Sequence, residues 1–287
     1  MKKSVFIVIF LILLNLFLSE AQAINLIIEE GKVRLSILPG QTKTGTINIK
    51  NTSSDSIEIK AYLEDWYYLP VADGSKEFKP ANTNALSCAS WISFAPAEFS
   101  IPAYGKQIVS YTVKVPKGVS GGHYAVLFFE SSMARPDSKE GVGVAVSIRM
   151  GSLFYIEPEG TIKREIRLGK LSVDRESEEA PLNISLDFKN TGNVDITASG
   201  TFHIIDDSGM VYARGEFDKA YTFAGDAGKL ASNWSEAIPK GRYDLILTID
   251  IGKALEEAGL GRGPVVTKEA GLEVGDRGQI IGVRELK

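Results

Sequence analysis

The sequence has little cysteine or histidine and no excess of positive charge. Its 287 residues include one cysteine, Cys88, and two histidines, His123 and His203. One cysteine excludes an intrachain disulfide, and neither histidine has a second ligand at metal spacing, so we expect no metal or other cofactor. The formal net charge of −4 argues against nucleic acid as a partner, because nucleic acid selects a basic face. Apolar burial must therefore stabilise the core.

Signatures of catalysis are also missing. The chain has no Gly-x-Ser-x-Gly elbow, no phosphate loop and no paired-cysteine motif. The glycine-rich stretch Gly141–Val146 opens an expected strand, which is the wrong context for a dinucleotide site. Asp206–Gly209 has some likeness to a calcium loop, but it lacks the later bidentate glutamate, and a hairpin turn explains it fully. We expect a protein that is not an enzyme, with a sandwich-fold carbohydrate-active enzyme as the least favoured alternative.

The first residues indicate export. Lys2 and Lys3 precede an apolar run, Val5–Leu18, and Ala21–Ala23 then supplies a small-x-small cleavage site. This order is typical of a secretory signal peptide. The run is shorter than the ~20 residues that span a bilayer, and no later run reaches that length. We therefore expect cleavage after Ala23, no integral membrane segment afterwards, and a location in the periplasm or at the cell surface.

The rest of the chain alternates apolar and polar residues with a period of two, which is typical of half-buried strands. Thr44–Lys50 and Ser56–Tyr62 flank a turn cluster at Asn51–Asp55. Further strands are expected at Trp91–Phe94, Gln107–Val115, His123–Glu130, Val142–Ile156, Ile166–Val173, Leu182–Asn190, Ile196–Ile205, Val211–Phe217, Arg242–Ile251 and Val265–Val274. Helical periodicity is confined to Lys253–Ala258.

The predicted fold is all-β, with two antiparallel immunoglobulin-like β-sandwich domains in tandem. The signal peptide occupies residues 1–23, the first sandwich 24–160, the second 161–274 and a C-terminal tail 275–287. Proline and glycine at Glu157–Gly160 interrupt the alternation and place the boundary there. The inward-facing set is expected to include Ile47, Ile49, Ile57, Ile59, Val113 and Leu186.

Motifs in the first domain resemble a PapD-like immunoglobulin domain. They are a short strand with a proline-delimited switch at Trp91–Lys106, then Val113–Pro116, and the strand start Gly121–Tyr124. Together with Leu38–Gln41, they are similar to the peptidoglycan-binding domain of the WxL-interacting proteins of bacterial surfaces. A second sandwich follows that domain in those proteins. This resemblance implies a binding protein of the cell envelope.

Periplasmic pilus chaperones are the other relatives that the chain resembles. Val144–Tyr155 is similar to their last strand of domain one, whose alternating apolar residues complete the sheet of a subunit. The resemblance implies that an arginine on the first strand, matched here by Arg34, helps to anchor a client carboxylate. The lysine expected shortly before Leu153 is missing, since Ser152 occupies the preceding position, and Arg149 is the nearest basic residue.

These features lead to one candidate site and two functions. Val142, Val144, Val146 and Ile148 share one face of a strand, opposite small residues on the other face. The strand either belongs to the core or lies at a sheet edge and adds to the sheet of a partner, with Arg34 or Arg149 holding the partner's carboxylate. The first function is an exported binding protein that joins or presents cell-surface proteins or cell-wall components. The alternative is a periplasmic chaperone that binds exported, pilus-like subunits by β-strand addition.

Overall fold

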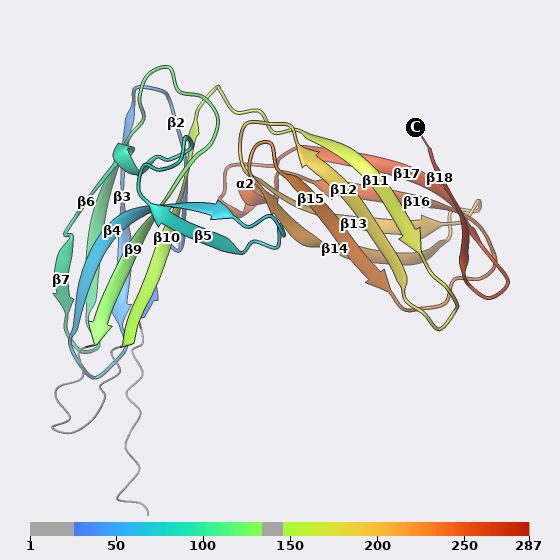
Figure 1. The fold of residues 1–287 in the computed structure, drawn as a ribbon, viewed down its shortest axis with the longest axis horizontal. Helices are drawn as coiled ribbons and strands as arrows, with labels where there is room; N and C mark the ends of the chain where they lie inside the picture. Colours follow the sequence, from blue (N-terminus) through green and yellow to red (C-terminus); the bar gives the residue numbers. More distant parts are fainter. Residues whose placement is uncertain (1–25, 134–145, 287) are drawn as a thin grey trace, which may run out of the picture.

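The computed structural model describes residues 26–133 and 146–286, and it confirms the all-β fold of two sandwiches. Figure 1 shows the amino-terminal sandwich in blue to green, joined at one end to the second sandwich in yellow to red. The expected signal peptide, Val142 and Val144 lie outside the described residues. Strand β10 ends at Pro158 and β11 begins at Ile166. The exact domain boundary near residue 160 stays a prediction.

The first sandwich has two sheets. The strand order in one sheet is β1 (Leu26–Ile28), β3 (Thr42–Asn51), β8 (Lys106–Lys114) and β6 (Ile92–Ala95). In the other sheet it is β2 (Lys32–Ile37), β10 (Val146–Pro158), β9 (His123–Met133), β4 (Ile57–Tyr68) and β5 (Lys76–Pro80), with β7 (Glu98–Ile101) also paired to β4. All pairs are antiparallel except β2 with β10, which is parallel. A short 3-10 helix, η1 (Ala89–Trp91), precedes β6.

The period-two pattern decides which side chains enter the core. On β3, Ile47 and Ile49 are fully buried, while Thr46 and Lys50 are exposed. The whole expected inward set is confirmed, since none of its six members is more than 5% exposed. Burying an apolar row on each sheet stabilises the sandwich by roughly 25 cal/mol per Å² removed from water.

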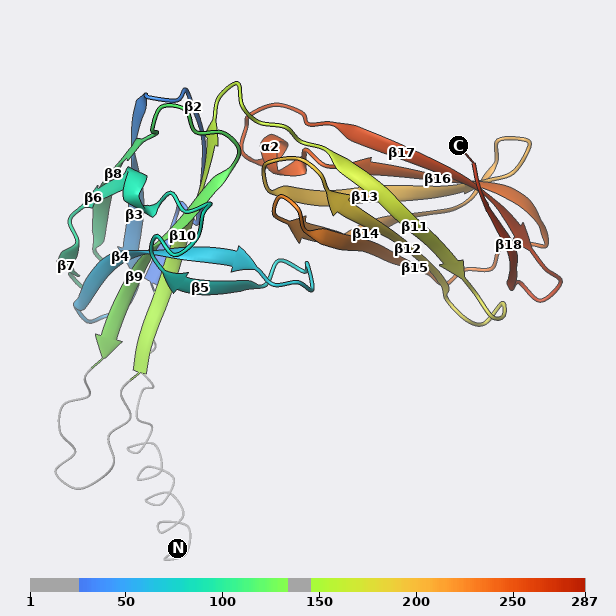
Figure 2. The same ribbon diagram turned by 45° about the horizontal axis from the view of Figure 1, so that its top comes forward.

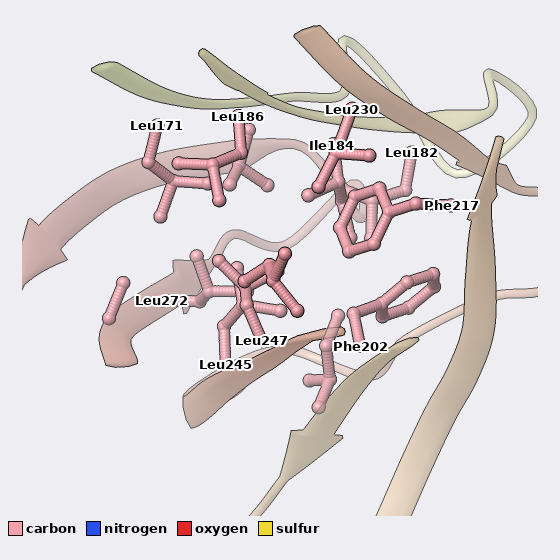
Figure 3. Close-up of a cluster of buried hydrophobic side chains, with 14 of the residues drawn as sticks. Leu171, Leu182, Ile184, Leu186, Phe202, Phe217, Leu230, Leu245, Leu247 and Leu272 are labelled. Carbon is pink, nitrogen blue, oxygen red and sulfur yellow. The ribbon is translucent and has the colours of Figure 1, made fainter. Parts of the chain in front are cut away.

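The second sandwich also has two sheets (Figure 2), and they enclose one apolar core. A three-stranded sheet contains β11 (Ile166–Asp174), β12 (Leu182–Asn190) and β15 (Ala227–Trp234). A five-stranded sheet has the order β14 (Val211–Thr222), β13 (Ile196–Ile205), β16 (Gly241–Asp250), β17 (Val265–Val274) and β18 (Ile280–Glu285). Figure 3 shows the side chains of these two sheets meeting between them, with Leu182 and Leu186 from one sheet and Phe202 and Leu245 from the other. The expected helical stretch forms α2 (Lys253–Glu257).

In the second sandwich one expected turn is confirmed, one strand is new and the expected tail is a strand. The turn at Asp206–Gly209 is confirmed, because the Asp206 carboxylate accepts hydrogen bonds from the backbone N–H groups of Ser208 (2.9 Å) and Met210 (3.0 Å). Strand β15 was not expected, because only Leu230 and Ser232 of its residues are buried, and this pattern is too weak to stand out. The expected tail is also corrected: residues 280–285 form β18, which pairs with β17.

Candidate functional site

Strand β10 is paired along all but its last two residues on one side and along only about half of its length on the other. Strand β9 pairs with it from Val146 to Ile156, whereas β2 pairs with it only from Leu153 to Pro158. Among the described residues, no strand pairs with the outer side of Val146–Ser152. We refer to Val146–Ser152 as the open edge.

The pairing with β2 stops at a defined point. The backbone N–H of Leu153 donates to the carbonyl of Gly31 at 3.0 Å, just before β2 begins at Lys32. The hydroxyl of the buried Ser152 donates to the carbonyl of Glu30. Upstream of these bonds the chain leaves β10 and continues into β1, which belongs to the opposite sheet. The open edge therefore begins where β2 separates from β10.

The open edge exposes backbone groups in a regular pattern. Leu153 directs its N–H away from β9, and alternate residues of a strand direct their N–H and C=O groups to the same side. The N–H and C=O groups of Ser147, Arg149 and Gly151 therefore point outward, where no strand of the described residues pairs with them. Unpaired strand edges of this kind are a template for another strand.

The side chains of the open edge also alternate. Met150 packs against the core of the first sandwich, Ile148 is half-buried, and Phe154 and Ile156 continue the same row into the interior. The side chain of Val146 lies outside what the structure describes. Ser147 and Arg149 are exposed on the other face. A strand placed beside the open edge would therefore meet apolar side chains toward the core and polar ones toward solvent.

Arg149 lies on the outer face of the open edge and already has partners. Its guanidinium contacts the Glu64 carboxylate at 3.1 Å and 3.2 Å and lies 4.0 Å from the centre of the Phe128 ring. Neighbouring Tyr62 donates to Glu130 at 2.7 Å. That hydrogen bond is the largest cause of the lowered pKa of Glu130. Arg149 is thus part of a polar network with Glu64, Tyr62 and Glu130 on the outer face of the open edge, which we refer to as the rim network.

Arg34 lies at the opposite end of β10, in a buried network between the two sandwiches. It donates to both Asp195 carboxylate oxygens, at 3.0 Å and 2.6 Å, and also to Glu157. Arg164 donates to the same Glu157 oxygen at 2.5 Å. Burial disfavours the charge of Arg34, but attraction to Asp195 and Glu157 outweighs it and raises the pKa of Arg34. The network thus pairs two cations with two anions.

The structure does not bring Arg34 and Arg149 together. The Arg34 guanidinium packs over the Tyr155 ring at 4.3 Å, and Tyr155 is six residues beyond Arg149 on β10. Six strand residues span roughly 20 Å. Because Asp195 and Glu157 occupy Arg34, a partner carboxylate could reach it only by displacing them. Its expected role toward a partner stays untested, and the geometry argues for an interdomain role instead.

Two lysines that the sequence analysis missed lie beside this network. Lys32 lines a cavity of about 110 Å³ together with Arg34, Tyr155 and Glu257. Lys76 lies at the start of β5. Burial of Lys76 lowers its pKa, and the nearby positive charge of Lys32 lowers it further. Neither lysine forms a salt bridge within the described part of the chain. They bring positive charge to the end of β2 at which the open edge begins.

Other classes of site find little support within residues 26–133 and 146–286. No group of three or more metal-ligating side chains is present there, and no helix is long and apolar enough to cross a membrane. Cys88 is fully buried, and burial raises the pKa of its thiol well above the usual range. A thiol in this state is a poor nucleophile.

Comparison with known proteins gives likenesses of fold. No family model matches the chain, and no curated protein matches it in sequence. The class 5 fimbriae chaperone CfaA is 13% identical, with a TM-score of 0.47 over 85% of this chain and 98% of that chain. The CupB2 chaperone of Pseudomonas aeruginosa is also 13% identical, with a TM-score of 0.42 over 85% and 98%. The Escherichia coli chaperone DraB is 11% identical, with a TM-score of 0.42 over 92% of this chain and 98% of that chain.

With identities of 11–13% and TM-scores below 0.5, these likenesses decide neither the superfamily nor the function of this chain.

Proposed function

We propose that this chain is an exported, non-enzymatic chaperone of the bacterial cell envelope that binds protein subunits by β-strand addition at the open edge. The observation that carries this proposal is the pairing of β10, whose residues Val146–Ser152 have β9 on one side and, within residues 26–133 and 146–286, no strand on the other. Main-chain hydrogen bonds to Ser147, Arg149 and Gly151 would supply affinity, and the apolar row would select the register.

The half-buried apolar row of the open edge favours a bound partner over an empty edge. An apolar edge without protection is an aggregation hazard, and native proteins blunt such edges with charge, proline or a cover. Along the apolar row of the open edge there is neither a charged residue nor a proline, because Ile148 and Met150 alternate with outward-facing residues. A client strand would cover this row and complete the sheet.

The direction of the client strand follows from β2. Strand β2 runs parallel to β10 and occupies the same side of it as the open edge. A client strand continuing in that direction would end next to Lys32, with Lys76 nearby. A C-terminal carboxylate would then meet two cations that lack a salt-bridge partner among the described residues. The proposed ligand is therefore an alternating apolar strand that ends in a free carboxylate.

The partner is proposed to be protein. A strand edge recognises a peptide backbone, so the site has no feature that would select the cell-wall polymer considered from the sequence. An adapter that joins two mature surface proteins would use the same edge, but it would hold its partner permanently. A chaperone releases its client, so exchange of one bound peptide for another separates these two functions.

A fluorescein-labelled nonapeptide of alternating valine and threonine with a free C-terminus tests the edge by fluorescence anisotropy. We expect the full chain to bind it, and Ile148→Lys to weaken binding by about 10-fold or more, because a charge replaces an apolar contact. Ser147→Lys is the matched control on the outer face and should bind within about 3-fold of the parent. Absence of binding by the parent, or equal losses in the two variants, would overturn the proposal.

The same peptide with a C-terminal amide tests the proposed carboxylate contact. The acid should bind about 10-fold more tightly than the amide, because a charge-assisted bond is lost with the amide. In Lys32→Ala the ratio of the two dissociation constants, amide to acid, should fall toward 1. If Lys32→Ala weakens the acid and the amide equally, Lys32 does not hold the carboxylate.

A further inference from the structure

The hairpin of β4 and β5 crosses from the first sandwich to the second. In both ribbon views this hairpin leaves the body of the first sandwich and points toward the second (Figures 1 and 2). Its tip, Leu69–Ser75, reaches β14, where the Tyr221 N–H donates to the carbonyl of Ala72 at 2.8 Å. The contact joins residues that are about half of the chain apart, so it is made only in the folded state.

Aromatic side chains fill the space beneath the hairpin. Trp66 on β4 is fully buried, and its ring lies 5.1 Å from that of Phe223, which follows β14. The ring of Tyr68 is 4.8 Å from the same Phe223 and 5.6 Å from Tyr221. Tyr124 of β9 completes the cluster at 4.3 Å from Phe223. Phe223 is only 6% exposed, so the second sandwich inserts a ring into an apolar cluster of the first.

The tip has a backbone shaped for this contact. Ala72 and Gly74 have φ angles of 58° and 91°, in the left-handed region that favours glycine. A Cβ atom on Gly74 would lie 2.9 Å from the Tyr221 ring, so glycine is also required by the close approach. The backbone N–H of Leu69 donates to the carbonyl of Ser75 at 2.9 Å and closes the turn.

We propose that the β4–β5 hairpin is an interdomain clamp that fixes the angle between the two sandwiches, independently of client binding. Domains joined by one short linker move relative to each other unless their interface is large and apolar. A two-stranded hairpin is marginally stable by itself, so its position here depends on packing against both sandwiches. The base of the clamp also adjoins the open edge: Phe78 of β5 contacts Phe128 at 4.9 Å, below Arg149.

Double electron–electron resonance, which measures the distance between two spin labels, tests the clamp on the full chain. Spin labels are placed at Ser110→Cys on β8 and Asn183→Cys on β12, two exposed positions on different sandwiches. The fully buried Cys88 stays unlabelled. We expect one narrow distance distribution in the parent and a distribution about twice as wide in Gly74→Val.

Gly209→Val is the matched control. Gly209 has a φ of 85°, close to that of Gly74, but an added Cβ meets nothing within 4 Å. Both variants thus suffer the same backbone strain, and only Gly74→Val disturbs the contact with Tyr221. Gly209→Val should retain the narrow distribution.

A second pair of variants covers the case in which Gly74→Val fails to fold by circular dichroism. Tyr221→Ala removes the ring under the tip, whereas Tyr212→Ala removes a tyrosine that packs within the second sandwich against Tyr243. The clamp predicts broadening only for Tyr221→Ala. If folded Gly74→Val or folded Tyr221→Ala keeps the distribution of the parent, the clamp is wrong, and the Arg34–Asp195 network alone holds the angle.

Discussion

The two halves of β10 share one inward-facing row of side chains, but they differ in sequence pattern and in surroundings. Leu153–Ile156 lies between β9 and β2. Phe154 and Ile156 are buried in the core of the first sandwich, and Tyr155 is buried in the cluster that includes Phe223 of the second. In Val146–Ser152 Ile148 is only half-buried, and no strand from the described part of the chain pairs with the outer side. The comparison teaches that alternation decides which face a side chain occupies, and that the neighbouring strand decides whether the edge is free.

The polar groups of the two halves differ in the same way. In the covered half, Glu157 is buried and shared between Arg34 and Arg164. In the open half, Arg149 is on the surface with Glu64, where an ion pair contributes little to stability. The covered half therefore contributes buried ion pairs between the two sandwiches, and the open half is the part that we propose binds a partner.

The largest difference in unfolding free energy is expected between apolar residues of the two halves. Phe154→Ala should lower the free energy of unfolding by about 3–5 kcal/mol, because it removes a fully buried ring and leaves a cavity. Ile148→Ala, in the open half, should cost at most about 1 kcal/mol, since water already reaches its side chain. Urea unfolding followed by tryptophan fluorescence measures both. Equal losses would show that the two halves are equally part of the core.

The arginines of the two halves provide the next comparison. Arg34→Met should lower the free energy of unfolding by about 3 kcal/mol, because it leaves Asp195 buried without its main partner. Arg149→Met is the matched exposed arginine and should cost about 0–1 kcal/mol. The measurement is again urea unfolding. A stable Arg34→Met would mean that the interdomain network is dispensable.

Amide exchange sharpens the comparison at the level of single backbone groups. The N–H groups of Arg149 and Gly151 should exchange at least about 100-fold faster than that of Tyr155, which faces β2. The alternating-peptide probe should slow the first two and leave Tyr155 unchanged. Exchange at Arg149 as slow as at Tyr155, without peptide, would show that the edge is already paired.

The smallest effect is the pH dependence of the rim. Hydrogen bonds from Tyr62 and then Ser147 lower the pKa of Glu130 in the folded state. A lowered carboxyl pKa contributes stability above the unfolded pKa, and this contribution is lost as pH falls through the folded pKa. The difference in unfolding free energy between parent and Glu130→Gln should therefore shrink between about pH 5 and about pH 3.

A difference between parent and Glu130→Gln that stays constant over this pH range would contradict the hydrogen bonds from Tyr62 and Ser147 to Glu130.

The sequence alone was enough for features that depend on local pattern. Alternation with a period of two placed Ile47 and Ile49 in the core, because adjacent strand residues face opposite sides. The turn at Asp206–Gly209 followed from side-chain chemistry within five residues. The weak pattern of β15 shows the limit, since a strand with only two buried residues gives little signal.

Only the tertiary structure decided which of these strands is free and which charges are in use. Val146 and Ile148 share a face by alternation, but the open edge exists because β2, more than 100 residues earlier, pairs no further than Leu153. The sequence predicts that Arg34 binds the carboxylate of a partner, but Asp195, 161 residues away, is bound to it in the folded chain. Lys32, Lys76 and the contact of Gly74 with Tyr221 depend likewise on how distant segments pack. Local pattern sets the direction of a side chain, whereas its neighbours are set by the folding of the whole chain, and binding depends on those neighbours.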